Sequence, residues 1–344
     1  EKTAWQMANI AQDFGFDGWL INIENPILQS HIEFVKLFLQ KLTQFSHQFN
    51  KHAQVIWYDS VTINGELKWQ DRLNELNRPF FDLCDGLFTN YTWKEGYPAE
   101  GAAAAGARRR WDVYFGIDVF GRNTYGGGGM QCNKALEKIA EAGVSAALFA
   151  PGWVMQNQME NGGSFTGNDP KEWDRTEEEF VKLSTEFWDK IKSFFEQRGP
   201  WISGSAFCTF FSQGVGKHFS IAGEAHQHDT FWYNVSLQSP DCRPKIERSN
   251  GSLKLLGDYE ESYEGGSCLQ ITGELHAGEE EPVNFDCSKI KVSASCTFEI
   301  SLTYKLSQHS RASLALVFLD ESGRGGGGQW RAGPIPLLAG ADAA

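Results

Sequence analysis

The feature that most constrains the fold of this chain is a unit of one helix and one strand that repeats five times before residue 150. Each unit joins an amphipathic helical pattern to a short apolar run, and the units recur at intervals of about thirty residues. Parallel strands need a crossover of this length between them, so the repeat predicts an α/β fold with a parallel sheet. The expected helices span residues 2–14, 31–49, 67–77, 99–109 and 133–142, and the expected strands span residues 19–23, 54–59, 86–91, 112–118 and 145–150.

Glycine placement separates the parallel architectures that fit this repeat. A dinucleotide-binding fold has a glycine fingerprint at its first strand–helix turn, and this chain has none there. The glycine run 126–129 lacks the lysine and the Ser or Thr of a phosphate loop, so we interpret it as a flexible loop. We therefore expect a (β/α)8-type barrel. A closed barrel needs eight units, so either its first three strands are lacking or the sheet is open, and the start on a helix favours the first alternative.

The pattern changes after a strong amphipathic helix, which is expected at residues 176–197. Gly199 and Pro200 end that helix, and beyond them short β runs alternate with turns, which is typical of an all-β sandwich. The runs that we expect to be strands are residues 205–211, 252–256, 268–272, 297–306 and 312–319. We therefore predict an N-terminally incomplete barrel over residues 1–198, a β-sandwich domain over residues 199–322, and a disordered tail or truncated end over residues 323–344.

Composition argues against several kinds of partner. A formal net charge of −13 argues against nucleic acid and against an anionic membrane surface, and the chain has no apolar run long enough to span a membrane. The seven cysteines are scattered and form no CxxC pair, which indicates a reducing compartment and neither a disulfide framework nor a zinc ribbon. Because His218, His226 and His228 have no evident carboxylate partner, we expect a surface loop there, with no metal and no cofactor.

Polar side chains gather at the ends of the expected strands. The run Gly18-Trp19-Leu20-Ile21-Asn22-Ile23-Glu24-Asn25 ends in two amides and a carboxylate. Because side chains alternate along a strand, Asn22 and Glu24 point to the same side, at the end where α/β barrels keep their chemistry. The alternative is that Glu24 is a solvated acid and Asn22 a turn-former. The later strands end in Tyr58 and Asp59, Asn90 and Trp93, Asp118 and Arg122, and Trp153.

Six longer motifs, taken in order, resemble glycoside hydrolase family 85, whose cytosolic members are endo-β-N-acetylglucosaminidases. The motifs are Phe16-Asp17-Gly18-Trp19-Leu20-Ile21-Asn22-Ile23-Glu24-Asn25, Trp57-Tyr58-Asp59-Ser60, Leu67-Lys68-Trp69-Gln70-Asp71, Phe88-Thr89-Asn90-Tyr91-Thr92-Trp93, Gly116-Ile117-Asp118-Val119-Phe120-Gly121-Arg122 and Leu148-Phe149-Ala150-Pro151-Gly152-Trp153. The resemblance covers roughly residues 1–320. It implies a cytosolic protein with a catalytic (β/α)8 barrel, an Asn-x-Glu motif at the end of the fourth strand, and β-sandwich domains after the barrel.

The resemblance also implies a reaction. Family members cleave between the two N-acetylglucosamine residues of the N-glycan core, so the expected partners are N-glycans, glycopeptides or free oligosaccharides. Carried onto this chain, Glu24 matches the general acid/base and Asn22 matches the residue that handles the acetamide of the substrate. Tyr58 matches a tyrosine beside that acetamide, and its alternative is an aromatic side chain that packs on the barrel rim.

A second group of residues is expected to bind the sugar chain. The resemblance places aromatic contacts at Trp69, Trp93 and Trp153. Flat tryptophan faces suit pyranose rings, although we expect at least half of the 12 tryptophans to pack in the core, and packing is the alternative for these three. Asn90 and Asp118 also end strands and complete the expected set, with a helix cap as the alternative for Asp118.

An asparagine in place of a second acid predicts substrate-assisted retaining hydrolysis. Most retaining glycosidases use two carboxylates about 5 Å apart, one of which forms a covalent intermediate, and an amide cannot replace it. The 2-acetamido oxygen of the substrate would then attack the anomeric carbon, while Asn22 orients the acetamide. Glu24 would protonate the leaving oxygen and later deprotonate the incoming water. An acceptor other than water would give transglycosylation.

Two other hypotheses remain open. A non-catalytic glycan-binding protein, or an inactive fragment of such an enzyme, would keep the aromatic cleft without turnover, and the lack of three barrel strands supports this hypothesis. An ordinary two-carboxylate glycosidase would pair Glu24 with Asp59 or Asp118. It would also act on substrates that have no 2-acetamido group.

Overall fold

The computed structural model describes residues 1–160, 170–195, 208–227, 232–234, 237–239, 245–246, 253–275, 283–284, 302–306, 312–314 and 335–337. The chain divides into two compact units, Glu1–Ser288 and Lys289–Ala344. The domain boundary predicted at residues 198 and 199 lies outside the described residues.

A five-stranded parallel sheet forms the centre of the first 150 residues, as the repeat predicts. Its strands, in sheet order, are β1 (Gly18–Ile21), β2 (Gln54–Tyr58), β3 (Gly86–Phe88), β4 (Val113–Asp118) and β5 (Ser145–Phe149). Neighbours in the sheet are consecutive in the sequence, which is the arrangement expected of a strand–helix–strand repeat. Among the described residues the sheet does not close on itself, so the closed barrel stays a prediction.

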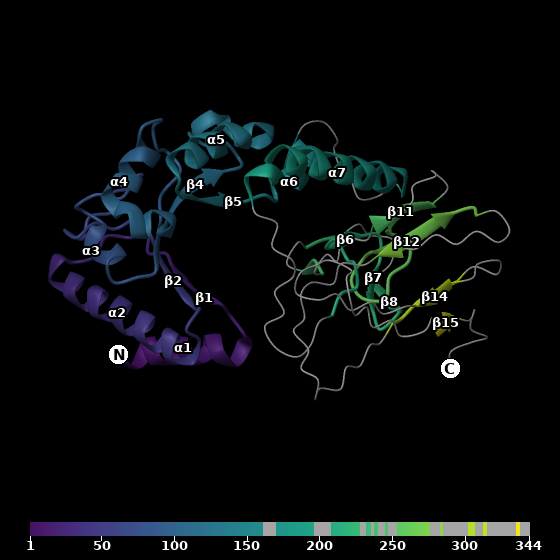
Figure 1. Ribbon diagram of the computed structural model, residues 1–344, viewed down its shortest axis with the longest axis horizontal. Helices are drawn as coiled ribbons and strands as arrows, with labels where there is room; N and C mark the ends of the chain where they lie inside the picture. The colour runs from purple at the N-terminus through teal and green to yellow at the C-terminus, as the bar shows by residue number, and fades with distance from the viewer. Residues whose placement is uncertain are drawn as a thin grey trace, which may run out of the picture. The chain divides into compact units, whose positions relative to one another are not determined.

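Helices α1 to α5 pack along one side of this sheet (Figure 1). The helices are α1 (Lys2–Phe14), α2 (Ile32–Phe49), α3 (Arg78–Phe81), α4 (Tyr97–Arg109), α5 (Cys132–Ala142), α6 (Trp153–Glu160) and α7 (Pro170–Ile191). Short 3-10 turns lie at Gln29–His31, Arg110–Asp112, Tyr125–Gly127, Gly129–Gln131 and Lys192–Phe194. The predicted helix 176–197 therefore begins earlier than expected and ends at Ile191.

Apolar spacing and glycine caps explain where the helices form and stop. Ala4, Ala8 and Ala11 are the buried residues of α1, and their spacing puts them on the face that packs against α2. The helix ends at Gly15, which has a φ of 71° and donates its N–H to Ala11 O. Glycine suits this left-handed cap because it has no Cβ. Gly143, with a φ of 65°, ends α5 in the same way.

The core lies between the sheet and these helices. Trp57 of β2 is fully buried, and its ring centroid lies 4.7 Å from that of Phe80 in α3. Leu87 of β3 and Phe115 of β4 are also fully buried. Burial of an aromatic or leucine side chain contributes about 1.5–3 kcal/mol each, so the packing of this layer stabilises the sheet.

The helix predicted at residues 67–77 is absent, and a loop takes its place. Val61 and Leu67 form an isolated antiparallel bridge, and helix follows only at α3, which has four residues. Two backbone N–H groups of the segment, those of Gln70 and Asp71, are bound by the buried Asp59 carboxylate and not by a helical carbonyl. The prediction was wrong because periodicity could not reveal this long-range acceptor.

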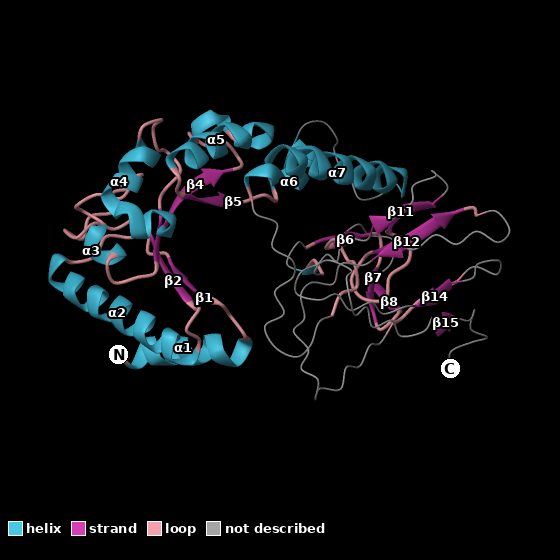
Figure 2. Cartoon of the chain, viewed as in Figure 1, coloured by secondary structure: helices cyan, strands magenta, loops and turns pink. Residues whose placement is uncertain are grey.

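Short strands dominate the described residues of the second half (Figure 2). They are β6 (Val215–Gly216), β7 (Phe219–Ile221), β8 (Glu224–Gln227), β9 (Trp232–Tyr233), β10 (Lys245–Ile246), β11 (Leu253–Asp258), β12 (Cys268–Gly273), β13 (Val283–Asn284) and, in the second unit, β14 (Ala312–Leu314) and β15 (Ile335–Leu337). The described strands form separate antiparallel pairs, β6 with β9, β7 with β8, β10 with β13, β11 with β12 and β14 with β15.

These pairs test some of the expected strands and leave the sandwich as a prediction. The strands expected at residues 252–256 and 268–272 correspond to β11 and β12, and β14 covers the start of the strand expected at 312–319. Residues 208–211 and 302–306 are not in strands, so the predictions there are wrong. Alternating apolar residues alone are a weak indicator, because an irregular, half-buried segment shows the same pattern. The other parts of those runs lie outside the described residues.

Candidate active site

Asn22 and Glu24 follow β1 directly and form a hydrogen-bonded pair. Trp19 of β1 faces the helices, where its Nε1 donates to Met7 O of α1 over 3.2 Å. Alternation then places Leu20 on the opposite face, where it is 48% exposed. Asn22 and Glu24 are both exposed, and Nδ2 of Asn22 donates to Oε1 of Glu24 over 3.2 Å. The structure therefore brings together the amide and the carboxylate that the sequence placed on one side.

Tyr58 ends the neighbouring strand β2 beside this pair. Its ring is nearly buried and meets the Phe88 ring edge-on at 5.5 Å. Its hydroxyl donates to Oδ1 of Asn90 over 3.1 Å. Burial, the neighbouring Tyr91 and the negative charges of Glu24 and Asp59 raise the pKa of Tyr58 strongly, so the hydroxyl keeps its proton at neutral pH.

Asn90, which follows β3, connects Tyr58 to the loop after β2. Its Nδ2 donates to Oδ1 of Asp71 over 2.8 Å and to Oγ1 of Thr92 over 3.1 Å. The Thr92 hydroxyl in turn shares its one proton between the two carboxylate oxygens of Asp71, which lie 2.8 and 2.9 Å from Oγ1. The Asn90 amide is thus occupied on both its oxygen and its nitrogen by protein groups.

Asp59 anchors the loop that carries Asp71. It is 1% exposed, and its Oδ2 accepts the N–H groups of Gln70, at 3.0 Å, and of Asp71, at 2.7 Å. Its Oδ1 accepts Nδ2 of Asn77 over 2.9 Å. Burial raises the pKa of Asp59 to about 7, although these hydrogen bonds oppose the shift. Asp59 therefore fixes the conformation of the loop through these three hydrogen bonds.

Asp118, at the end of β4, forms a two-point ion pair with Arg122. Nε of Arg122 lies 2.8 Å from Oδ2 and Nη2 lies 3.1 Å from Oδ1, while the N–H groups of Phe120 and Arg122 complete the contacts. Burial alone would raise the pKa of Asp118, but the hydrogen bonds and the positive charge of Arg122 outweigh it, and the pKa is lowered. The Asp118 side chain is 1% exposed and that of Arg122 is 66% exposed. Of the two, the guanidinium is the group that a ligand can reach.

The three tryptophans expected to contact sugar lie in different environments. Trp69, in the loop after β2, is 40% exposed. Trp93 is 2% exposed, stacks on Tyr125 at 4.9 Å and donates Nε1 to Gly116 O over 2.8 Å, so its ring offers no open face and the packing alternative is favoured. Trp153, at the start of α6, is half-buried, and its ring centroid lies 6.5 Å from that of Phe187.

Tyr91 is a site residue that the sequence analysis did not single out. Its ring stacks on Phe149 of β5 at 5.2 Å and lies near Phe88 and Tyr58. Burial raises the pKa of its hydroxyl, and the charges of Asp118 and Glu24 act in the same direction, while a hydrogen bond with the Tyr58 hydroxyl and the charge of Arg122 oppose the shift. A Cβ on Gly116 would lie 2.8 Å from the Tyr91 ring and 2.5 Å from Thr89 O, so glycine is required there. A glycine within a strand often marks a close approach of another group, so Gly116 was the feature of the sequence that could have indicated the contact with Tyr91.

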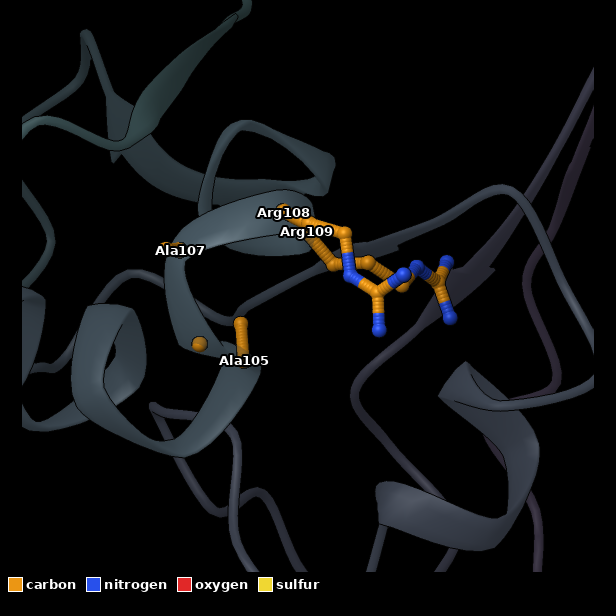
Figure 3. Close-up of a pocket in the computed structure, with 5 residues that line it drawn as sticks. Ala105, Ala107, Arg108 and Arg109 are labelled. Carbon is orange, nitrogen blue, oxygen red and sulfur yellow. The ribbon is translucent and has the colours of Figure 1, made fainter.

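A depression in the surface lies away from this group of residues. It is lined by Ala105, Gly106, Ala107, Arg108 and Arg109, around the kink at Gly106 of α4 (Figure 3). This end of α4 leads into the start of β4, so the depression lies near the amino ends of the strands. Chemistry in parallel α/β folds takes place at the carboxyl ends, where Asn22 and Glu24 lie.

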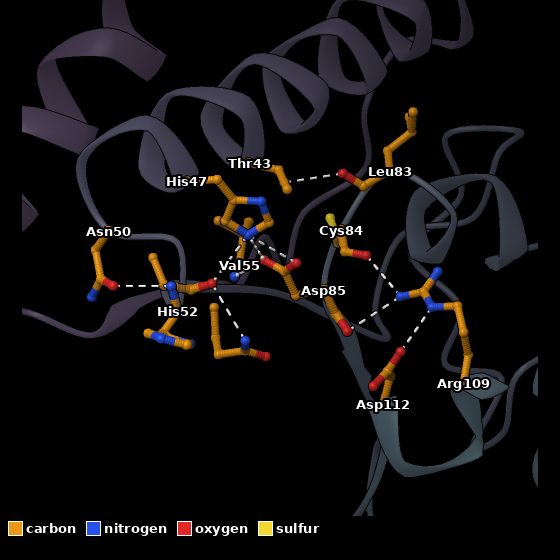
Figure 4. A network of polar contacts seen from close by, with 12 residues as sticks. Thr43, His47, Asn50, His52, Val55, Leu83, Cys84, Asp85, Arg109 and Asp112 are labelled. Carbon is orange, nitrogen blue, oxygen red and sulfur yellow. Dashed lines mark hydrogen bonds and ion pairs between the residues drawn. The ribbon is translucent and has the colours of Figure 1, made fainter. Parts of the chain in front are cut away.

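The amino ends of β2 and β3 are held by a polar network (Figure 4). His47 Nε2 lies 3.1 Å from the Asp85 carboxylate, which also accepts the Val55 N–H over 2.8 Å. Arg109 donates to the carbonyl oxygens of Cys84 and Asp85. In these contacts the polar groups bind one another, so we infer that this end of the sheet stabilises the fold.

Within the ranges that the structure describes, no group of three His, Cys, Asp or Glu side chains is placed to hold a metal ion. In the same ranges, no helix combines the length and the apolar composition needed to cross a membrane.

An exposed carboxylate at the carboxyl end of a parallel α/β sheet is compatible with a glycoside hydrolase, because these enzymes use carboxyl groups for acid/base catalysis and α/β barrels keep their chemistry at that end. The chain belongs to glycosyl hydrolase family 85, whose family model matches residues 1–219. This match confirms the family that the six motifs indicated.

Known relatives agree with this assignment. The chain is 38% identical to cytosolic endo-beta-N-acetylglucosaminidase 1 of Arabidopsis thaliana over an alignment of 319 residues. This alignment covers 91% of the chain and 43% of the relative. The chain is 44% identical over 253 residues to cytosolic endo-beta-N-acetylglucosaminidase 2 of the same plant, which covers 74% of this chain and 33% of the relative. The chain therefore spans less than half the length of these two relatives.

A solved structure supports the fold. The glycoside hydrolase domain of Endo-D from Streptococcus pneumoniae aligns with a TM-score of 0.50 over 78% of this chain and 44% of that chain. The two sequences are 20% identical over this alignment, so the likeness concerns architecture alone.

Proposed function

We propose that this chain carries the acid/base centre of an endo-β-N-acetylglucosaminidase that cleaves between the two N-acetylglucosamine residues of the N-glycan core. The observation that carries the proposal is the exposed, hydrogen-bonded pair of Asn22 and Glu24 at the carboxyl end of β1. Family membership and the names of the relatives support this substrate class and a cytosolic location. N-glycans, glycopeptides and free oligosaccharides are the proposed partners.

In the proposed mechanism, the substrate supplies its own nucleophile. The acetamido oxygen attacks the anomeric carbon and forms an oxazoline-type intermediate, while Glu24 protonates the leaving oxygen. Asn22 orients the acetamide and stabilises its developing charge. Glu24 then deprotonates the incoming water, whose oxygen attacks the anomeric carbon and breaks the bond from that carbon to the acetamido oxygen, which restores the acetamide. A sugar hydroxyl in place of water gives a transglycosylated glycan by the same step.

The environments of the other strand-end acids support substrate assistance. A two-carboxylate enzyme would need Asp59 or Asp118 as a free nucleophile facing Glu24. Both side chains are 1% exposed, and both carboxylates accept hydrogen bonds from the protein. Neither is presented to a sugar, whereas the two side chains that the mechanism does need, Asn22 and Glu24, are exposed.

The proposed sugar-binding residues differ in how directly they contact substrate. Trp69 is exposed enough to stack on a pyranose ring, and Arg122 offers a guanidinium beside the site. Trp153 is half-buried and offers part of its ring. Asp118 acts through Arg122, and Asn90 acts through Tyr58, the side chain that we place beside the acetamide.

The test compares two matched glycopeptides in the full chain. One has the natural chitobiose core, and in the other the reacting sugar has a 2-hydroxyl in place of the 2-acetamido group. We expect release from the first only, by a factor of at least about 100, with retention of configuration at the anomeric carbon. Equal release from both would contradict substrate assistance. Binding of both without release would identify a glycan-binding protein.

A further inference from the structure

We propose that Asp71 and Asn90 are positioning residues that fix the direction of the Tyr58 O–H bond. This inference rests on the function proposed above and adds two residues to its site. It is carried by the chain of hydrogen bonds that runs from Asp71 through Asn90 to Tyr58.

The carboxylate of Asp71 determines the donor and the acceptor in each hydrogen bond of this series. A carboxylate only accepts hydrogen bonds, so the nitrogen of Asn90 must face Asp71. The Thr92 hydroxyl donates to the same carboxylate and therefore accepts the second N–H of Asn90. The amide oxygen is then left to face Tyr58, and because a carbonyl oxygen donates nothing, Tyr58 must be the donor.

This order of donors and acceptors decides what Tyr58 presents to the site. A tyrosine hydroxyl has one proton, and the Asn90 oxygen can only accept it, whereas the Tyr91 hydroxyl, which is also hydrogen-bonded to that of Tyr58, has a proton of its own to donate. With its proton on Asn90, the Tyr58 oxygen has lone pairs left to accept from the Tyr91 hydroxyl and from a ligand in the site. If Asn90 turned its amide over, the hydroxyl would meet two N–H donors and would reorient.

The position of Asp71 is itself constrained by the fold. Its φ is 57°, in the left-handed region that few residues other than glycine, asparagine and aspartate adopt readily. Its N–H is bound by the buried Asp59 carboxylate over 2.7 Å, which holds the backbone in this conformation. Strain of this kind collects where surrounding structure fixes a side chain for use.

The matched substitution is Asp71→Asn. Asparagine has the same size and tolerates the same positive φ, so the backbone is preserved. Its amide offers a donor as well as an acceptor, and the orientation of Asn90 is then no longer forced. Asn90→Ala removes the contact to Tyr58 altogether.

The first experiment is a double-mutant cycle with Tyr58→Phe, read as kcat/KM on a chitobiose-core glycopeptide in the full chain. With Tyr58 present, we expect Asp71→Asn and Asn90→Ala to lower kcat/KM by about tenfold. In the Tyr58→Phe background, the same two substitutions should change it by less than about twofold. If Asp71→Asn and Asn90→Ala lower kcat/KM by the same factor with and without the Tyr58 hydroxyl, the inference is overturned, because a merely structural role does not depend on that hydroxyl.

The second experiment does not need activity. The resonance of Tyr58 Cζ in tyrosine-labelled protein is identified by its loss in Tyr58→Phe, and it reports the hydrogen bonding of the hydroxyl. We expect Asp71→Asn and Asn90→Ala to move it. If the two substitutions leave the Tyr58 resonance unchanged, the positioning role is refuted, even if the wild type is an active enzyme. If they shift the resonance but the wild type has no activity, only the proposed function is refuted.

Asn50→Ala is the control for both experiments. Oδ1 of Asn50 accepts the His52 N–H over 2.9 Å at the opposite end of β2 (Figure 4). This substitution removes one asparagine hydrogen bond outside the site. It should change neither kcat/KM nor the Tyr58 resonance, and a change as large as that of Asn90→Ala would count against the inference.

Discussion

The amide nitrogen of Asn22 lies 3.2 Å from the carboxylate oxygen Oε1 of Glu24, one residue beyond the end of β1. An amide that donates to an acid keeps that acid in one place without adding a second charge. The other acids at the strand ends, Asp59 and Asp118, are buried and hydrogen-bonded within the protein. Among the described strand ends, Glu24 is thus the exposed acid placed for proton transfer, and the predictions below start from it.

Glu24→Gln should remove the proton donor while leaving the fold intact. We expect kcat to fall by about 10²–10⁴, the usual contribution of general acid–base catalysis, with an unchanged melting temperature because the side chain is exposed. Rates of glycan release measure this effect. Glu66→Gln, which changes an exposed acid in the loop after β2, is the control and should behave as wild type. Comparable loss in both variants would remove Glu24 from the mechanism.

Trp69→Ala and Trp93→Ala should separate binding from packing. Trp69 is exposed, so its loss should raise KM by about three- to tenfold, as expected for one stacking contact, and leave stability within about 0.5 kcal/mol. Trp93 is buried and bound to Gly116 O, so its loss should cost about 3–5 kcal/mol of unfolding free energy. Denaturant unfolding and substrate-dependence curves measure both effects. The reverse pattern would restore Trp93 as a sugar contact.

Asp59 should make the stability of the loop after β2 depend on pH. Its pKa is about 7 in the folded chain and 3.8 in the ordinary carboxyl group, so folding favours the protonated form. The stabilisation from this group is complete below the lower pKa and is lost as the pH rises through about 7, a change on the order of a few kcal/mol.

The test of this dependence uses Asp59→Asn, which cannot titrate. Unfolding free energies at about pH 5 and about pH 8 should fall with pH in wild type and should fall less in the variant. The variant also turns an amide donor towards Asn77 Nδ2, so its overall stability drops, and the pH slope is the quantity to compare. An identical slope in both proteins would show that Asp59 does not titrate in this range.

Arg122→Gln should have the opposite pH signature. The pKa of Asp118 is lowered in the folded chain, so its contribution to stability is present above the unfolded pKa and is lost as the pH falls through the folded value. Without the guanidinium, the buried carboxylate keeps only backbone N–H donors. We expect the variant to be less stable than wild type at neutral pH, with the difference closing in acid. A pH-independent difference would point to lost packing of Arg122 on the Phe120 ring.

Local patterns determined much of this protein from the sequence. Helical spacing predicted α1 and α2, because their buried residues recur within one element, while alanine content predicted α4 and the glycine at 143 marked the end of α5. The alternation of a strand put Asn22 and Glu24 on one side, since that depends only on a period of two. The order of the six motifs was enough to indicate the family, which the match over residues 1–219 confirms.

Only the tertiary structure decided the features that depend on contacts between distant residues. Residues 67–77 are a loop in which the N–H groups of Gln70 and Asp71 are bound by the side chain of Asp59, which lies 11 and 12 residues upstream of them. Trp93 is buried because Tyr125 stacks on its ring and the Gly116 carbonyl accepts its N–H, whereas Trp69 is exposed. The motif that contains Trp93 does not reveal these contacts. Asn90 is occupied by Tyr58 and Asp71, which lie on other segments. A sequence pattern records the spacing within one element, whereas burial and hydrogen-bond partners are set by which elements the fold places side by side.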